Sequence, residues 1–221
     1  PMVIGSLAML FPLWWMLALS LETEQRAGAA LASGSPFDAL PTDPQFGNYG
    51  QAMQEVGTTP WLGFIDALSN SIVVTVLVVI GTILSSSLVG TAFARIRFRG
   101  RQPTFLLMLA TMMLPAQVTM IPLFILFRSL GWVDTLLPLI VPAFFGSAFH
   151  IFMYRQFIAQ LPEALFEAAR LDGCGWLETW WRIIMPLTRP VAAITAVFTF
   201  IFTWNDFMLP LIYLHSEDQA T

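Results

Sequence analysis

The sequence contains long apolar segments that carry no formal charge. The clearest runs from Ala67 to Ala94 and holds no Asp, Glu, Lys or Arg. It is longer than the roughly 20 helical residues that a bilayer core of about 30 Å requires. Because peptide groups inside lipid must find hydrogen-bond partners within their own segment, a helix is expected. This feature predicts an integral membrane protein.

Four further segments reach a similar length, so we expect an all-α, polytopic transmembrane helical bundle. Charged residues make up only 11% of the chain, against about 25% in soluble domains. Too little polar chain therefore remains to cover the helices in water, which excludes a soluble enzyme. Residues 1–221 are interpreted as one membrane domain. The five predicted spans are 2–21, 67–94, 103–127, 135–154 and 190–214.

Composition excludes several other chemistries. Cys174 is the only cysteine and there are two histidines, so no spacing typical of a metal site is present. The net charge of −4 gives no reason to expect nucleic acid. We predict no catalytic residue, no metal and no disulfide.

Arginine placement sets the orientation, because short cytoplasmic loops hold the positive excess. Eight of the ten arginines lie in 95–102 and 155–189, two loops separated by an even number of predicted spans. Both loops are predicted to be cytoplasmic. The mostly acidic segment 22–66 is predicted to be external, and it is either a solvated loop or a surface for a partner. We expect weak helicity near Asn48 to Val56.

The two ends lead us to expect a piece of a longer protein. Pro1 lies inside an apolar run, and Thr221 follows shortly after another. Five spans with an external end leave an unfinished topology, so we expect a sixth helix in the full chain.

The loop at 155–189 has its own helical pattern. Pro162 suits a first helical position, Glu163 suits the positive end of the helix dipole, and Gly173 suits the left-handed residue that ends a helix. We expect a second amphipathic helix with Glu178 and Arg182 as an ion pair, and Pro186 is expected to end it at Met185. Its predicted apolar face consists of Leu177, Trp180, Trp181 and Ile184. These features alone also fit a plain connector at the membrane surface.

The same loop carries a family resemblance. Glu167-Ala168-Ala169 is followed by Gly173 after three residues, and then by Ile183-x-Met185-Pro186. This string resembles the EAA loop of permease subunits of bacterial ABC importers, with Met185 where the family pattern has Leu. The likeness continues through Asn70-Ser71, Ala92 to Gly100, Ile121 to Leu123, Leu130-Gly131 and Trp204 to Phe207. Together these strings resemble the second permease of maltose-type sugar importers.

The resemblance implies a type I permease in a bacterial or archaeal cytoplasmic membrane. Its expected partners are a second permease, two ATPase subunits, an extracytoplasmic solute-binding protein and a sugar. ATP and Mg would be used by the ATPase subunits, because this chain contains no phosphate-binding glycine loop. Glu167 either contacts the ATPase or pairs with Arg170. The expected coupling residues are Glu163, Glu167, Ala168, Ala169, Asp172, Gly173, Ile183 and Pro186.

Polar residues inside the spans suggest a pathway. Asp206 is costly at mid-membrane, so with Asn205 it either lines the pathway or bonds to neighbouring helices. Gln117, between Pro115 and Pro122, marks a predicted kink and is a weaker pathway candidate. His150 is interpreted as a packed or interfacial residue.

The cargo is not encoded in these motifs. A polyol or glycerol phosphate is the alternative to a sugar. An ion-coupled secondary transporter is supported only by Asp206, and a membrane scaffold would not need the surface loop at 162–186.

Overall fold

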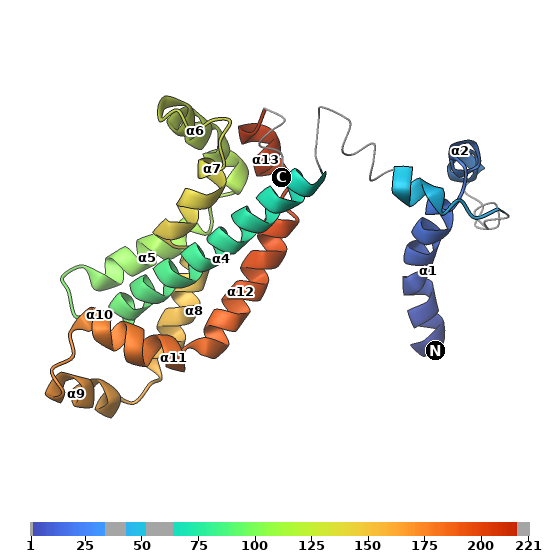
Figure 1. The fold of residues 1–221 in the computed structure, drawn as a ribbon. Coiled ribbons are helices and arrows are strands. Elements are labelled where there is room, and N and C mark those ends of the chain that lie inside the picture. Colours follow the sequence, from blue (N-terminus) through green and yellow to red (C-terminus); the bar gives the residue numbers. More distant parts are fainter. Residues whose placement is uncertain (1, 34–42, 52–63, 216–221) are drawn as a thin grey trace. The chain divides into compact units, whose positions relative to one another are not determined.

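The structure is a computed structural model that describes residues 2–33, 43–51 and 64–215 (Figure 1). The described residues form helices and turns without any strand, so the all-α prediction is confirmed. The chain divides into two compact units, Pro1–Phe64 and Ile65–Thr221.

The first unit contains α1 (Met2–Ser20) and α2 (Glu24–Ser33). Ala18 and Ala30 are buried together between them. The segment 22–66, predicted to be a solvated loop or a partner surface, contains α2, where alanines favour a helix and Glu24 suits the first turn. Residues 47–51 are helical, and the rest of the helix predicted near Asn48 to Val56 lies outside the described residues.

A polar network ties the described parts of this first unit together. The Asn48 side chain donates to the carbonyls of Ser20 and Glu22 at 3.0 and 2.9 Å. The hydroxyls of Ser20 and Tyr49 lie 2.6 Å apart. These bonds connect the end of α1 to the helical turn at 47–51.

The second unit begins at the second residue of α4 (Phe64–Arg95), one uninterrupted helix over the predicted span 67–94. Small residues on α4 allow close packing against the segment 141–159. A Cβ atom at Gly81 would lie 2.8 Å from the Phe144 ring, so only glycine fits without a shift.

The predicted span 103–127 is not one straight helix. It divides into α5 (Arg101–Thr111) and α6 (Ala116–Ser129), which are bent by 99°. The break lies before Pro115 rather than between Pro115 and Pro122. A proline disfavours the helical conformation in the residue before it, which agrees with a break just before Pro115. Pro115 itself is extended at the start of α6, and Pro122 remains inside that helix.

The predicted span 135–154 is also composite. It contains α7 (Leu137–Ile140), a 3₁₀ turn η1 (Val141–Phe145) and α8 (Ala148–Ala159). Gly146 has a φ of 89° between the last two elements. Because α8 continues to Ala159, the first residues of the predicted loop 155–189 belong to this helix.

The loop itself holds α9 (Glu163–Leu171), α10 (Trp176–Thr179), a π turn η2 (Trp180–Ile184) and α11 (Met185–Leu187). The expectation that Pro186 ends the helix at Met185 was wrong. Met185 N donates to Trp180 O, five residues back. The widened π turn precedes Pro186, and Pro186 takes an early position in α11, where its missing N–H costs little.

The last predicted span, 190–214, is interrupted as well. α12 (Arg189–Trp204) is followed by a break at 205–207 and α13 (Met208–Tyr213). Tyr213 is buried against Phe127 with ring centres 5.4 Å apart, and its carbonyl accepts from Asp134 N at 2.8 Å. α13 is therefore fixed to the turn after α6.

Two helical segments in the described chain, Ala67–Arg95 and Leu137–Ala159, are long and apolar enough to cross a membrane. Two bent helix pairs, 101–129 and 176–204, are also long and apolar enough when the two helices of each pair are taken together. Met9–Ser20 is a shorter apolar helix. The number of spans, predicted as five, stays a prediction.

Candidate functional site

α9 presents one face to the bundle and leaves the other exposed. Phe166 and Ala169 are buried, whereas Glu167, Ala168 and Asp172 are exposed. Phe166 packs in a core cluster whose other buried members are Tyr154, Ile158, Ile184 and Val191. The helix is therefore anchored along one side, and part of the predicted EAA motif faces outward.

Gly173 ends α9 as the sequence predicted. Its φ is 80°, the left-handed conformation that favours glycine. Cys174 N donates to Ala169 O at 2.9 Å and Gly173 N to Arg170 O at 3.1 Å, the paired bonds of a Schellman motif. The turn satisfies carbonyls at the end of α9 and sharply redirects the chain toward α10.

The second amphipathic helix is only partly as predicted. Trp180 packs against the core cluster, and its indole N–H donates to Ser87 Oγ on α4 at 3.3 Å. Ile184 is buried, but Leu177 and Trp181 are exposed. The π turn changes the helical register, so the four residues do not share one buried face. The coupling candidates Ile183 and Pro186 are half-buried and exposed, respectively.

The charged residues of the loop have distinct environments. Glu178 and Arg182 form the predicted ion pair at 3.1 Å. None of the ion pairs among the described residues includes Glu167, and Arg170 instead places its guanidinium over the Trp176 ring. Glu163 pairs with Arg95 at 2.6 Å. Both glutamates among the coupling candidates are exposed, and in the described part of the chain Glu163 has an ion-pair partner whereas Glu167 has none.

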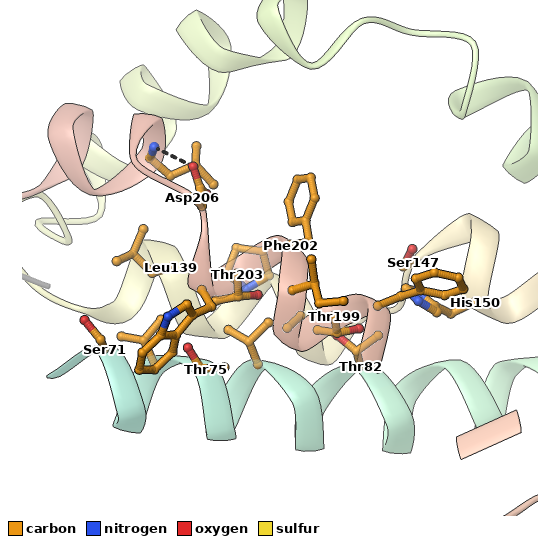
Figure 2. A pocket seen from close by; sticks show the side chains of 18 of the residues that line it. Ser71, Thr75, Thr82, Leu139, Ser147, His150, Thr199, Phe202, Thr203 and Asp206 are labelled. Carbon is orange, nitrogen blue, oxygen red and sulfur yellow. Dashed lines mark hydrogen bonds between the residues drawn. The ribbon is translucent and has the colours of Figure 1, made fainter. Parts of the chain in front are cut away.

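A cavity of about 650 Å³ lies between α4, the segment 139–150 and the end of α12 (Figure 2). Most of its lining is apolar, with polar groups distributed along it. Figure 2 places Asp206 and His150 toward opposite ends, with Thr82 and Thr199 between them. The polar lining residues are Ser71, Thr75, Thr82, Ser147, His150, Thr199, Thr203 and Asp206.

The three predicted pathway residues differ in their placement. Asp206 lines the cavity, and its Oδ1 accepts from the N–H groups of Met208 and Leu209 at 3.1 and 3.3 Å, which caps α13. Asn205 donates to Ile201 O at 2.7 Å within its own segment. These bonds lie within 201–209, and the choice between a pathway role and bonds to neighbouring helices stays a prediction. Gln117 is exposed on α6, away from the cavity lining.

The sequence analysis missed several cavity residues. Both ring nitrogens of His150 and the Thr199 hydroxyl are buried without a hydrogen-bond partner in the described part of the chain. A signal was present, because Ser71, Thr75 and Thr82 recur at spacings of four and seven on one helix face. Such hydroxyls are common in membrane helices, so their spacing alone does not identify a cavity.

Comparison with known proteins identifies the family. A family model described as "Binding-protein-dependent transport system inner membrane component" matches residues 86–218. The arabinooligosaccharides transport system permease protein AraQ of Bacillus subtilis is 33% identical over 98% of this chain and 74% of its own length. The sn-glycerol-3-phosphate transport system permease protein UgpE of Yersinia pestis is 33% identical over 100% of this chain and 76% of its own.

A further AraQ, from Halalkalibacterium halodurans, is 38% identical over 69% of this chain, and the match spans only 54% of that relative. A crystal structure of a bacterial ABC transporter involved in the import of the acidic polysaccharide alginate matches with a TM-score of 0.81 and 28% identity. That match covers 99% of this chain and 73% of the other. The chain therefore belongs to the family of binding-protein-dependent transport system inner membrane components, and it is a membrane-embedded transport permease.

Proposed function

We propose that this chain is a permease subunit of an ATP-driven ABC importer for sugars, and that it forms half of the translocation pathway. The observation that carries this proposal is α9, a capped helix that is anchored on one side and exposed on the other. The names of the relatives AraQ and UgpE support an importer of sugars or related solutes. The expected partners are a second permease, two ATPase subunits and an extracytoplasmic solute-binding protein, in a bacterial or archaeal cytoplasmic membrane.

The exposed residues of α9 are the proposed contact with an ATPase subunit. Glu167 offers an exposed carboxylate without an ion-pair partner among the described residues, and Ala168 beside it allows close approach. Asp172 and Gly173 extend the same surface to the end of the helix. Phe166, buried in the core cluster, would transmit a displacement of this surface into the bundle.

The cavity is the proposed part of the pathway that this chain contributes. Its volume of about 650 Å³ falls within the roughly 300–1,000 Å³ typical of small-molecule sites. Hydroxyl, imidazole and carboxylate groups along an apolar wall suit a ligand rich in hydroxyls. The unpartnered His150 nitrogens and Thr199 hydroxyl are groups that such a ligand could reach after a local shift of the wall.

The charge of the residues that line the cavity favours one class of cargo over another. Asp206 is the formally charged residue at the cavity, and none of its described lining residues is an arginine. A phosphate would meet a negative charge there without a compensating cation. We therefore favour a neutral sugar over glycerol phosphate, which is the cargo in the name of UgpE.

ATP hydrolysis belongs, in this proposal, to the partner subunits. The chain has no lysine, since its ten basic residues are all arginines, and so it cannot supply the lysine of a phosphate-binding loop. ATP and Mg would be bound by the ATPase subunits, and this chain would act without a cofactor of its own.

The decisive experiment is uptake by the complete transporter in proteoliposomes, with and without a mutation in the ATPase site of the partner. Loss of uptake in that mutant, together with nucleotide-dependent crosslinking from a cysteine at position 167 to the ATPase, would support the proposal. Uptake that survives the ATPase mutation but is abolished by an ionophore would instead support ion-coupled secondary transport.

A further inference from the structure

The side chain of Arg95, the last residue of α4, contacts three structural elements. Its Nη1 donates to Glu163 Oε2 on α9 at 2.6 Å, and its Nη2 donates to the carbonyls of Ile158, at 2.7 Å, and Leu161. The guanidinium also lies over the Phe166 ring, 4.1 Å from its centre. One side chain thereby joins the end of α4, the end of α8 and the first half of α9.

The electrostatics of these contacts agree with their positions. Ile158 lies in the last turn of α8 and Leu161 just beyond it, at the end where the helix dipole is negative. The Ile158 carbonyl also accepts from Leu161 N at 3.2 Å. Glu163 lies in the first turn of α9, where the dipole is positive. Arg95 therefore supplies the positive charge that the end of α8 requires. Its planar fork can bond to a carboxylate and to carbonyls at the same time, which an ammonium group does less well.

The contacts of Arg95 differ in how strongly they stabilise the arrangement of the helices. The Arg95 side chain is 11% exposed, whereas that of Glu163 is 60% exposed. An ion pair with a partner this exposed contributes little alone. The bonds to the two carbonyls are part-buried and fix Arg95 to the end of α8 and the turn after it. The stacking on buried Phe166 holds α9, and it is less exposed to water than the ion pair.

We propose that Arg95 is a positioning residue that transmits a displacement of α9 to α4 and α8 together. Both of these helices line the cavity, α4 through residues such as Thr75 and Thr82 and α8 through His150. A movement of α9 carried by Arg95 would therefore shift two walls of the cavity at once. This inference rests on the proposed function of α9 as the ATPase-docking helix.

The test uses the full-length permease with its partner subunits in proteoliposomes, with Cys174→Ser as background. Sugar uptake and ATP hydrolysis are measured with Glu167 in place, and crosslinking to the ATPase is measured in separate samples that carry a cysteine at position 167. For Arg95→Gln we expect the ratio of uptake to hydrolysis to fall by about tenfold, within the 5–150-fold range typical of coupling between sites, while the crosslink remains. Arg95→Lys should give a smaller fall, because an ammonium group keeps the positive charge but lacks the planar fork of the guanidinium.

The matched control is Arg97→Gln, since Arg97 is exposed two residues further along the chain. A charge exchange, Arg95→Glu with Glu163→Arg, adds a sharper test. It restores an ion pair but places a carboxylate against the carbonyls of Ile158 and Leu161, so we expect no rescue.

Three results would overturn the inference: uptake and hydrolysis that fall in equal proportion in Arg95→Gln and Arg95→Lys, the same uncoupling in Arg97→Gln, or rescue by the charge exchange. If Arg95→Gln does not accumulate in the membrane, Arg95→Lys decides. A failure of the proposed function would be distinct, because the position-167 crosslink would then be absent even with Arg95 intact.

Discussion

Gly90 on α4 packs directly against Tyr154 on α8, so closely that a Cβ atom at position 90 would lie 2.6 Å from the Tyr154 Cβ. Tyr154 is fully buried in the core cluster that also holds Phe166 of α9. The contact brings α4 and α8 together between the cavity and α9. Its geometry explains why a glycine stands inside α4, near the C-terminal end of the helix, where it would otherwise be unfavourable.

Gly90→Ala is therefore expected to destabilise the bundle. The added methyl would force α4 and α8 apart, and overpacking of this kind costs about 1–3 kcal/mol. Thermal unfolding of the purified protein in detergent, followed by tryptophan fluorescence, measures the change. Gly28→Ala is the control, because Gly28 lies in a helix with nothing within 4 Å of its added Cβ and should be neutral or stabilising. Equal melting temperatures for the two variants would contradict the packing argument.

Glu167→Ala is expected to lower uptake without lowering the amount of permease in the membrane. Glu167 is exposed and is absent from the ion pairs of the described chain, so the bundle does not depend on it. Glu178→Ala serves as the control. It removes a carboxylate that pairs with Arg182, and both residues lie in the helical segment that follows α9. Uptake and immunoblot abundance, measured side by side, test this. Normal uptake in Glu167→Ala would remove Glu167 from the proposed ATPase contact.

Substitutions at Gly173 separate backbone strain from docking. The position has a φ of 80° and open space around an added Cβ, so the cost of a side chain there is conformational. Asn tolerates this conformation, whereas Val should destabilise the end of α9 by about 1–2 kcal/mol. We expect Gly173→Asn to retain most of the uptake and Gly173→Val to lose it.

Gly173→Asp completes that series. Asp also tolerates the left-handed conformation, but it adds a charge to the surface proposed to meet the ATPase. Uptake should fall while thermal stability stays near that of Gly173→Asn. If Asn and Asp behave alike in transport, the surface at Gly173 does not contact the ATPase.

The loop at 155–189 was the part of the structure that the sequence predicted best. The turn at Gly173 and the pair of Glu178 with Arg182 depend on residues close together in the chain, so local rules are sufficient. The resemblance to the permease family is confirmed by the match over residues 86–218. The prediction for Pro186 was wrong because the spacing of apolar positions does not reveal a π turn. The hydrogen bonds of such a turn join residues five apart, instead of four apart as in an α-helix.

The breaks and the cavity were harder to predict, because they depend on contacts between distant segments. A hydropathy pattern shows that 103–127 is apolar, but the bend of 99° before Pro115 does not alter that pattern. His150, Thr82 and Thr199 come from three separate segments, and they line one cavity only after those segments pack. Arg95 was assigned to a basic loop from its sequence, whereas its carbonyl acceptors and Phe166 lie more than 60 positions away.

Asp206 has two roles that different substitutions can separate. It caps α13 through the N–H groups of Met208 and Leu209, and it lines the cavity. Asp206→Ala should lose about 1 kcal/mol of stability with the cap, while Asp206→Asn should keep it, since both Asp and Asn are good capping residues. If the carboxylate binds cargo hydroxyls, Asp206→Asn should still raise the half-saturation concentration for uptake. An unchanged value would leave Asp206 with its capping role alone.

Thr199→Val tests the cavity from its centre. The Thr199 hydroxyl is buried without a partner in the described chain, so replacing it by a methyl of the same shape removes an unsatisfied polar group. Such a change is expected to leave thermal stability unchanged or slightly higher, by up to about 1 kcal/mol. Uptake should nevertheless fall if the hydroxyl contacts a sugar. Ser129→Ala, on an exposed hydroxyl bonded within α6, is the control that should change neither quantity. A Thr199→Val permease that is more stable and transports normally would show that the cavity wall at Thr199 does not meet the cargo.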